Sequence, residues 1–174
     1  KMWCLGNEMD GEWQVGHKTA YEYGRLANET AKAMRLFDKN IELVVCGSSS
    51  DTMKTFPEWE REVLDLTYDS VDYISMHKYW SNSEDRSDER EIGKHNTTNY
   101  LTNSIGLQTY ISDVESTINF IKSKKRSTKN IKISFDEYQP WYHSIEKMNT
   151  HLNSNIKDWP KAYPILEEKY NLLD

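Results

Sequence analysis

The sequence predicts an α/β fold built on a parallel sheet. Strand-like apolar runs alternate with helical stretches along the 174 residues, and two of these runs are nearly continuous in apolar residues, as strands covered on both faces are. Aromatic residues make up 12% of the chain, which indicates a folded protein because disordered chains contain few of them. Alternation of this kind implies parallel strands joined by right-handed crossovers within one domain.

Four strands are expected, at residues 2–5, 42–46, 72–77 and 131–135. The second and third are the runs that read as fully buried strands. A polar stretch at about residues 81–105 follows the third strand.

Three helices are expected between these strands, over residues 17–37, from Pro57 onward, and over residues 108–124. Proline suits the first turn of a helix. Apolar residues recur at three- and four-residue steps in each helix and define the faces expected to point inward. These faces comprise Ala20, Tyr23, Ala27, Ala31 and Met34 in the first helix, Trp59, Val63 and Leu66 in the second, and Ile111, Val114, Ile118 and Ile121 in the third.

Charge and cysteine content exclude several classes of protein. A net charge of −6 does not fit an extended nucleic-acid surface, and no apolar run approaches the roughly 18–20 residues of a membrane span, so neither partner is expected. Cys4 and Cys46 lie in apolar runs and are expected to be buried thiols rather than a disulfide or a metal pair. The five histidines show no metal-ligand spacing, so no metal is expected.

Polar and aromatic residues collect where the predicted strands end. Two of them are carboxylates, Glu8 after the first strand and Glu137 after the fourth, and His77 and Tyr79 lie at the end of the third. The carboxyl ends of parallel strands share one face of the fold, where active sites lie. Glycoside hydrolysis needs two carboxyl groups across the scissile bond, about 5–5.5 Å apart in a retaining enzyme. The pattern predicts such a pair in Glu8 and Glu137.

Other interpretations of these residues stay open. A glutamate at a strand end is often a solvated or capping group, and a single histidine such as His77 is often structural. Asp10 and Asp136 compete for the carboxylate roles, although strand alternation predicts that Asp136 points away from the face that Glu137 takes. Residues 47–50 resemble a phosphate cradle loosely and are more simply a turn. The element pattern fits a doubly wound sheet and a barrel equally well.

Several segments resemble the family 51 α-L-arabinofuranosidases. Residues 3–11, Trp-Cys-Leu-Gly-Asn-Glu-Met-Asp-Gly, followed by Trp13, are similar to the acid/base segment of that family. Residues 71–79, Val-Asp-Tyr-Ile-Ser-Met-His-Lys-Tyr, are similar to its sixth barrel strand, and residues 134–137, Ser-Phe-Asp-Glu, to its nucleophile segment on the seventh. Residues 42–49 fit its fifth strand, so the resemblance extends over nearly the whole chain.

The resemblance implies a (β/α)8 TIM barrel, of which about four βα units, the fourth to seventh strands, are present. It implies a retaining, exo-acting enzyme that hydrolyses terminal non-reducing α-L-arabinofuranosyl groups of arabinoxylan, arabinan and their oligosaccharides without a cofactor. By position, Glu8 is then the acid/base and Glu137 the nucleophile. The residues that contact the sugar would be Asn7, His77, Tyr79 and Trp141, with Tyr79 also supporting the nucleophile. Glu8 is expected to be kept protonated by its like-charged neighbour and by partial burial.

This chain departs from the family at two places beside the cleft. The family usually has Trp-Asn-Val where this chain has Tyr138-Gln139-Pro140, and Pro where Glu12 stands. These departures bear on substrate range more than on reaction type. Two alternatives remain, another retaining barrel glycosidase of the β-xylanase or β-glucosidase type, and a non-catalytic truncated fragment that binds sugar.

Residues 1–174 are expected to form part of a catalytic barrel domain, because a complete barrel takes roughly 250 residues. The first strands, the eighth strand and the C-terminal β-sandwich of the family are expected to be absent. Half a barrel leaves strand edges open, so a homo-oligomer is expected, as is inactivity unless a second copy or the remaining strands close the sheet. A cytoplasmic location is favoured over secretion.

Overall fold

The computed structural model describes residues 1–80 and 103–140. The chain divides into two compact units, one of residues 1–78 and 107–138 and the other of residues 79–106 and 139–174. In the second unit, the described residues are the last two of β3, the short 3-10 helix η1 (Asn103–Gly106) and the last two of β4. The fold and the site below belong to the first unit.

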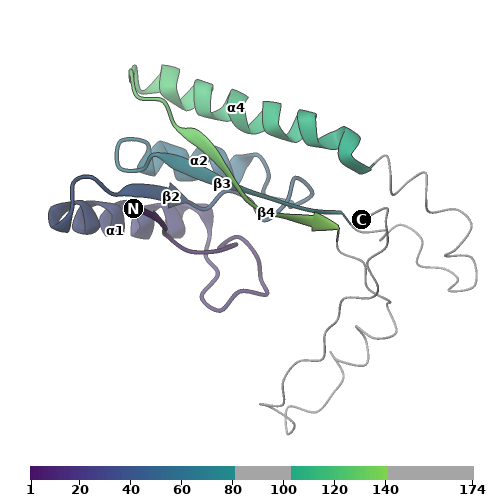
Figure 1. Cartoon of the computed structure of the whole chain (residues 1–174), viewed down its shortest axis with the longest axis horizontal. Helices are drawn as coiled ribbons and strands as arrows, with labels where there is room; N and C mark the ends of the chain where they lie inside the picture. The colour runs from purple at the N-terminus through teal and green to yellow at the C-terminus, as the bar shows by residue number, and fades with distance from the viewer. Residues whose placement is uncertain (81–102, 141–174) are drawn as a thin grey trace, which may run out of the picture. The chain divides into compact units, whose positions relative to one another are not determined.

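Strands and helices alternate through the described residues, as predicted (Figure 1). Their bounds are β1 (Met2–Cys4), α1 (Ala20–Phe37), β2 (Glu42–Val45), α2 (Glu58–Thr67), β3 (Tyr73–Trp80), α4 (Leu107–Lys124) and β4 (Lys132–Pro140). Helix α1 begins at Ala20 rather than at residue 17 because Thr19 and Glu22 form a reciprocal capping box there. Nearly all of the polar stretch predicted at 81–105 lies outside the described residues.

The four strands form one sheet in the order β1-β2-β3-β4. Strand β2 pairs in parallel with β1, with Trp3 opposite Leu43, and with β3, with Val44 opposite Tyr73. Strand β4 follows β3 at the other edge, where the Lys132 N–H donates to the Asp72 carbonyl at 3.0 Å.

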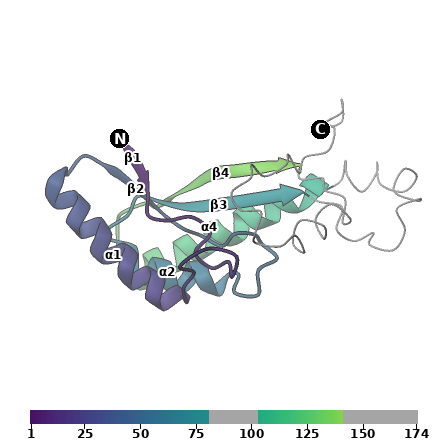
Figure 2. The same cartoon turned by 90° about the horizontal axis from the view of Figure 1, so that it is seen from below.

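The three helices α1, α2 and α4 cover the same face of this sheet (Figure 2). Because the strands follow one another in chain order and every crossover has the same hand, each helix returns on the same side. A doubly wound sheet reverses its strand order and carries helices on both faces, so the arrangement is that of half a TIM barrel. The fold class predicted from the sequence is confirmed.

The core lies between the helices and the sheet, and it contains most residues of the predicted faces. The fully or nearly fully buried residues include Tyr23, Ala27 and Ala31 of α1, Trp59, Val63 and Leu64 of α2, Tyr110, Val114, Ile118 and Ile121 of α4, and Leu43, Val45, Ile74 and Met76 of the sheet. The Tyr23 and Trp59 rings stack at a centroid separation of 5.6 Å. Leu66 was expected to point into the core, but Leu64 is the fully buried leucine of α2. Leu66 is half-buried beside Gly24 of α1.

Two other expectations were wrong in part. Cys46 is buried and Cys4 is exposed, because Cys4 lies on an edge strand whose residues are all exposed; both are free thiols. Strands β3 and β4 also continue beyond residues 77 and 135, through the polar residues that suggested loops. Within residues 1–80 and 103–140, none of the helices has the length and apolar character needed to cross a membrane.

Candidate active site

Glu8 lies on the loop that follows β1, and its carboxylate is held by donors from the same loop. The Trp13 indole Nε1–H donates to Glu8 Oε2 at 2.8 Å, and the Gln14 amide donates to the same oxygen at 3.3 Å. Gly11 makes room for the indole, because a Cβ there would lie 2.4 Å from the Trp13 ring. The φ angle of Glu8 is 45°, a left-handed conformation that is uncommon for a residue with a side chain and typical of functional positions.

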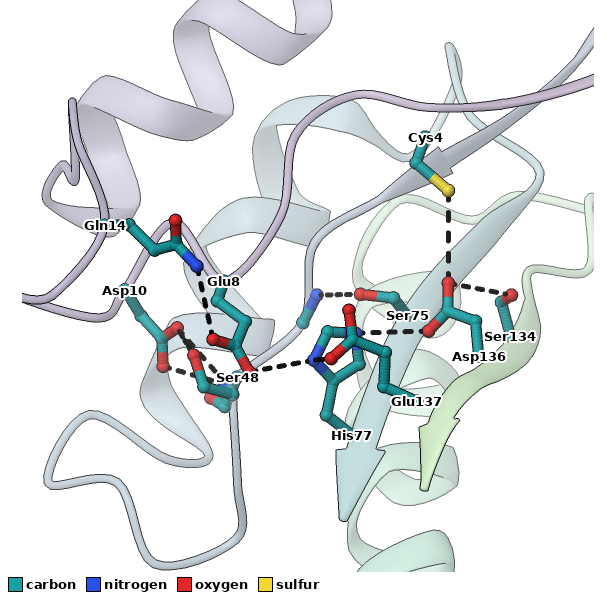
Figure 3. A network of polar contacts seen from close by, with 12 residues as sticks. Cys4, Glu8, Asp10, Gln14, Ser48, Ser75, His77, Ser134, Asp136 and Glu137 are labelled. Atoms are coloured by element: carbon teal, nitrogen blue, oxygen red, sulfur yellow. Dashed lines mark hydrogen bonds and ion pairs between the residues drawn. The ribbon is translucent and has the colours of Figure 1, made fainter. Parts of the chain in front are cut away.

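His77 lies on β3 between the two predicted carboxylates (Figure 3). Its Nδ1 is 3.2 Å from Glu8 Oε1 and 3.6 Å from Glu137 Oε2. The residue is 4% exposed, so this buried imidazole connects the loop after β1 with strand β4. One oxygen from each of Glu8 and Glu137 and one ring nitrogen of His77 all lie within 4.8 Å of one another. The structure therefore brings three of the predicted site residues together.

Asp136 also contacts this histidine, which the sequence analysis did not predict. Its Oδ1 lies 3.2 Å from His77 Nε2, whereas Glu137 faces Nδ1. The expectation that Asp136 points away from the site was wrong. Both Asp136 and Glu137 line the same pocket, and the two nitrogens of the His77 ring let it contact both carboxylates (Figure 3).

His77, Asp136 and Glu137 line a pocket of about 240 Å³ at the carboxyl ends of the strands. Its lining includes the predicted sugar-binding residue Asn7, together with Cys4, Gly6, Val44, Val45, Cys46, Ser75, His77, Asp136 and Glu137. Thus Asn7 and Glu137 face a common space, which a small ligand could enter.

The charges of the cluster depend on one another. Burial lowers the pKa of His77, but its hydrogen bonds with Asp136 and Glu8 and the charges of Glu137 and Asp136 outweigh this and raise that pKa to about 9. The imidazole is therefore a cation at neutral pH. The ring itself therefore provides a positive charge beside these carboxylates.

The pKa of Glu8 is shifted in the opposite direction from the one expected. Burial raises the pKa of Glu8, but hydrogen bonds from His77, Trp13 and Gln14 outweigh burial and lower it below its usual value. The expectation that Glu8 is kept protonated does not hold in this arrangement. The sequence alone did not show that an imidazolium and an indole N–H face the same carboxylate.

Asp10, the other competing carboxylate, has a structural role instead. Its oxygens accept the Ser49 N–H at 3.1 and 3.2 Å and also the Ser49 hydroxyl. The neighbouring Ser48 N–H donates to buried Glu60 at 2.7 Å. The amides of Ser48 and Ser49 are thus bound to carboxylates of the protein, so they do not form a phosphate cradle, and residues 47–50 are irregular backbone with a bend at Ser49 rather than a turn.

Two predicted site residues cannot be placed in this cluster. Tyr79 lies two residues after His77 on β3 but belongs to the second unit, and Trp141 lies outside the described residues. Their roles stay predictions. Sequence analysis missed Asp136 and Gln14 as parts of the site; the signal for Asp136 was its place directly before Glu137, and Gln14 carried none.

Known proteins provide an independent comparison, although no family model matches the chain. An intracellular exo-α-(1→5)-L-arabinofuranosidase of Acetivibrio thermocellus is 51% identical over all 174 residues, and one of Bacillus subtilis is 49% identical, with 32% of each relative covered. A family 51 α-L-arabinofuranosidase structure from Bifidobacterium longum matches 87% of this chain and 28% of its own, at 35% identity and a TM-score of 0.75.

The structure of an α-L-arabinofuranosidase from Thermotoga maritima, an arabinose complex, matches 82% of this chain and 25% of its own, at 34% identity and a TM-score of 0.64. The chain thus spans about a third of the length of the curated relatives that it matches. Whole-length sequence similarity and a shared half-barrel fold together show that this chain belongs, as a segment of the barrel, to family 51 of the glycoside hydrolases, the α-L-arabinofuranosidases.

Proposed function

We propose that the chain is the catalytic-site segment of a retaining, exo-acting α-L-arabinofuranosidase, with Glu8 as the acid/base and Glu137 as the nucleophile. The observation that carries the proposal is the approach of the two carboxylates, which come from separate elements and lie with His77 within 4.8 Å. This separation fits retaining glycosidases, at about 5–5.5 Å, rather than inverting ones, at about 6.5–9.5 Å.

The reaction would proceed by two displacements. Glu137 attacks the anomeric carbon while Glu8 gives its proton to the departing glycosidic oxygen, which leaves an arabinosyl ester on Glu137. Glu8, now ionised, takes a proton from water as that water cleaves the ester. Because hydrogen bonds lower the pKa of Glu8, the first step should be fastest at mildly acidic pH, where more of Glu8 carries the proton.

The substrate would be a terminal, non-reducing α-L-arabinofuranosyl group of arabinan, arabinoxylan or their oligosaccharides. A pocket of about 240 Å³ lies below the range of about 300–1,000 Å³ common for drug-sized ligands, which suits a single sugar unit. The names of the relatives, exo-α-(1→5)-L-arabinofuranosidases described as intracellular, support an α-(1→5) linkage and a cytoplasmic location.

The domain boundaries follow from the same proposal. Residues 1–174 would supply the fourth to seventh strands of the barrel. The other strands, and a C-terminal β-sandwich, would come from chain beyond these residues. The coverage of 32% of each curated relative supports this division.

The test compares the 174-residue chain with a chimera in which it replaces the aligned segment of the Acetivibrio thermocellus relative. We expect the chimera to hydrolyse an aryl α-L-arabinofuranoside much faster than an aryl β-xyloside. Faster hydrolysis of the xyloside would favour the other glycosidase class, and no hydrolysis by either protein would favour a non-catalytic fragment.

Variants of the chimera test the division of roles. Glu137→Ala should abolish formation of a retained product, with or without azide. Glu8→Ala should slow substrates with poor leaving groups far more than activated aryl substrates, and azide should give a retained arabinosyl azide. Equal losses on both substrate classes would contradict the roles assigned.

A further inference from the structure

The Nε2 atom of His77 makes a contact, with Asp136, that the two-carboxylate mechanism does not use. Asp136 Oδ1 lies 3.2 Å from His77 Nε2, while Nδ1 faces Glu8 Oε1 at 3.2 Å and Glu137 Oε2 at 3.6 Å. One buried imidazole thus meets three carboxylates, two of which are the proposed catalytic groups (Figure 3).

Asp136 is itself fixed by two donors on its other oxygen. The Ser134 hydroxyl is 3.3 Å from Asp136 Oδ2, and the Cys4 thiol is 3.9 Å from the same atom. Ser134 lies on β4 with Asp136, whereas Cys4 lies on β1, so the curl of the sheet brings its two edge strands together at this carboxylate. These donors leave Oδ1 for the histidine.

We propose that Asp136 is a positioning residue, which holds the His77 ring through Nε2 so that an Nδ1–H is presented to both Glu8 and Glu137. The proposal rests on the function proposed above for the same site. It assigns to Asp136 no contact with the sugar.

The hydrogen-bond geometry requires protons on both nitrogens. Each nitrogen of His77 faces carboxylate oxygens, which accept hydrogen bonds when ionised, so a neutral ring would direct one lone pair against a negative charge. The charged groups facing the ring are Glu8 from the loop after β1 and Asp136 and Glu137 from β4. Lys78, the next residue of β3, is paired with Asp51 at 2.6 Å. The high pKa of His77 agrees with this balance.

A fixed imidazolium would serve both halves of the reaction. Before attack, its charge favours the ionised Glu137 that the nucleophile must be. Once Glu137 is esterified its charge is gone, and the imidazolium then favours the ionised form of Glu8, which acts as the base. Asp136 would thus act on catalysis through His77.

The primary test is a ¹⁵N NMR titration of the histidine side chains in the 174-residue chain, with His77→Gln to assign the resonance. We expect both nitrogens of His77 to be protonated at pH 7, and a titration midpoint of about 9. Asp136→Asn keeps an oxygen that can accept the Nε2–H but removes the charge, so the midpoint should fall by about one unit or more. Asp113→Asn makes the same charge change at an exposed residue of α4 and should leave the titration midpoint of His77 unchanged.

An unprotonated Nδ1 in the wild-type chain at pH 7 would overturn the proposal, even if no variant folded. An unchanged His77 midpoint in Asp136→Asn would overturn it as well. Because this readout needs no substrate, the expected titration in an inactive enzyme would refute the proposed function and leave the positioning contact intact.

The pH profile of the active chimera separates positioning from a merely structural role. With Asp136→Asn, the His77 ring loses the carboxylate that holds it against Glu8, so the hydrogen bond that lowers the pKa of Glu8 weakens. The pKa of Glu8 should then rise, and the basic limb of kcat/KM should move to higher pH. The decline of kcat should exceed any change in KM, because a ring that is no longer fixed stabilises less well the ionised Glu8 that deglycosylation needs. A lower rate with an unmoved profile would indicate a structural role alone.

Discussion

At Glu8, three hydrogen-bond donors meet a single carboxylate. Trp13 and Gln14 both donate to Oε2, and His77 faces Oε1. Each donor stabilises the ionised form, and together they lower the pKa although burial alone would raise it. A general acid must carry a proton, so the surroundings of Glu8 set the pH above which the proposed enzyme loses activity.

Replacement of one of these hydrogen-bond donors to Glu8 should shift the pH above which activity is lost. Trp13→Phe removes the indole N–H but keeps a ring over Gly11, so the pKa of Glu8 should rise by up to about one unit, the equivalent of a hydrogen bond of about 1.4 kcal/mol. The measurement is the pH dependence of kcat/KM on an aryl α-L-arabinofuranoside, whose basic limb should shift to higher pH. Trp3→Phe, at an exposed tryptophan on β1, is the matched control. A basic limb that stayed in place would show that Trp13 does not control Glu8.

Residue types and strand order were enough to predict the location of Glu8 and Glu137, because chemistry at the carboxyl ends of parallel strands follows from topology. The ionisation of Glu8 and the contact between Asp136 and His77 could not be predicted from the sequence. Both depend on the position of one imidazole to within a hydrogen-bond length, and alternation predicts the side of a strand but no such distance.

Among the elements, the segment that follows β2 passes unusually close to β3 where the pocket begins. A Cβ at Gly47 would lie 2.2 Å from the Ser75 carbonyl oxygen, and the Gly47 N–H donates to the Ser75 hydroxyl at 3.2 Å. The obstructing atom belongs to the backbone of a buried strand, so it cannot move away as a flexible side chain could.

Gly47→Ala should therefore destabilise the half-barrel, by about 1–3 kcal/mol in the free energy of unfolding, as overpacking of a core does. Urea unfolding followed by circular dichroism measures this value. Gly106→Ala offers a control, because a Cβ there would meet no atom within 4 Å, and its effect should stay within about 0.5 kcal/mol. Equal stability of the two variants would contradict the close approach of Gly47 to β3.

The helices were easier to predict than the strand ends. Their apolar periodicity and the capping pair of Thr19 and Glu22 are local signals, and the buried faces of α1 and α4 follow them closely. Strands β3 and β4 continue through polar residues that find partners in the site, so composition alone placed the ends of these strands too early.

For the first unit as a whole, strand order and the side taken by the helices distinguish a barrel from a doubly wound sheet (Figure 2). The β1 edge leaves apolar groups uncovered beside the end of α1. Phe37 is 99% exposed and Trp3 is 53% exposed, and both line a groove of about 470 Å³ with Met34 and Ile41. Uncovered apolar surface beside an open strand edge favours association.

The 174-residue chain should therefore self-associate, and loss of the apolar groups should weaken that association. A Trp3→Ser/Phe37→Ser double variant should raise the dissociation constant at least about tenfold, because burial of one large apolar side chain contributes about 1.5–3 kcal/mol. Sedimentation velocity over a concentration series measures it. Phe120→Ser removes a comparably exposed aromatic from α4 and should have little effect. A wild-type chain that stays monomeric at every concentration would contradict the expected association.

Covalent trapping tests the central claim, that Glu137 is the nucleophile and Glu8 the acid/base, most directly. In the Glu8→Ala chimera, an activated aryl α-L-arabinofuranoside should still arabinosylate the enzyme, while hydrolysis of the ester is slowed for lack of a base. Peptide mass spectrometry after a rapid acid quench should then find one arabinosyl group on the peptide that contains Glu137. An arabinosyl group on another residue, or turnover with an inverted product and no labelled peptide, would contradict the claim.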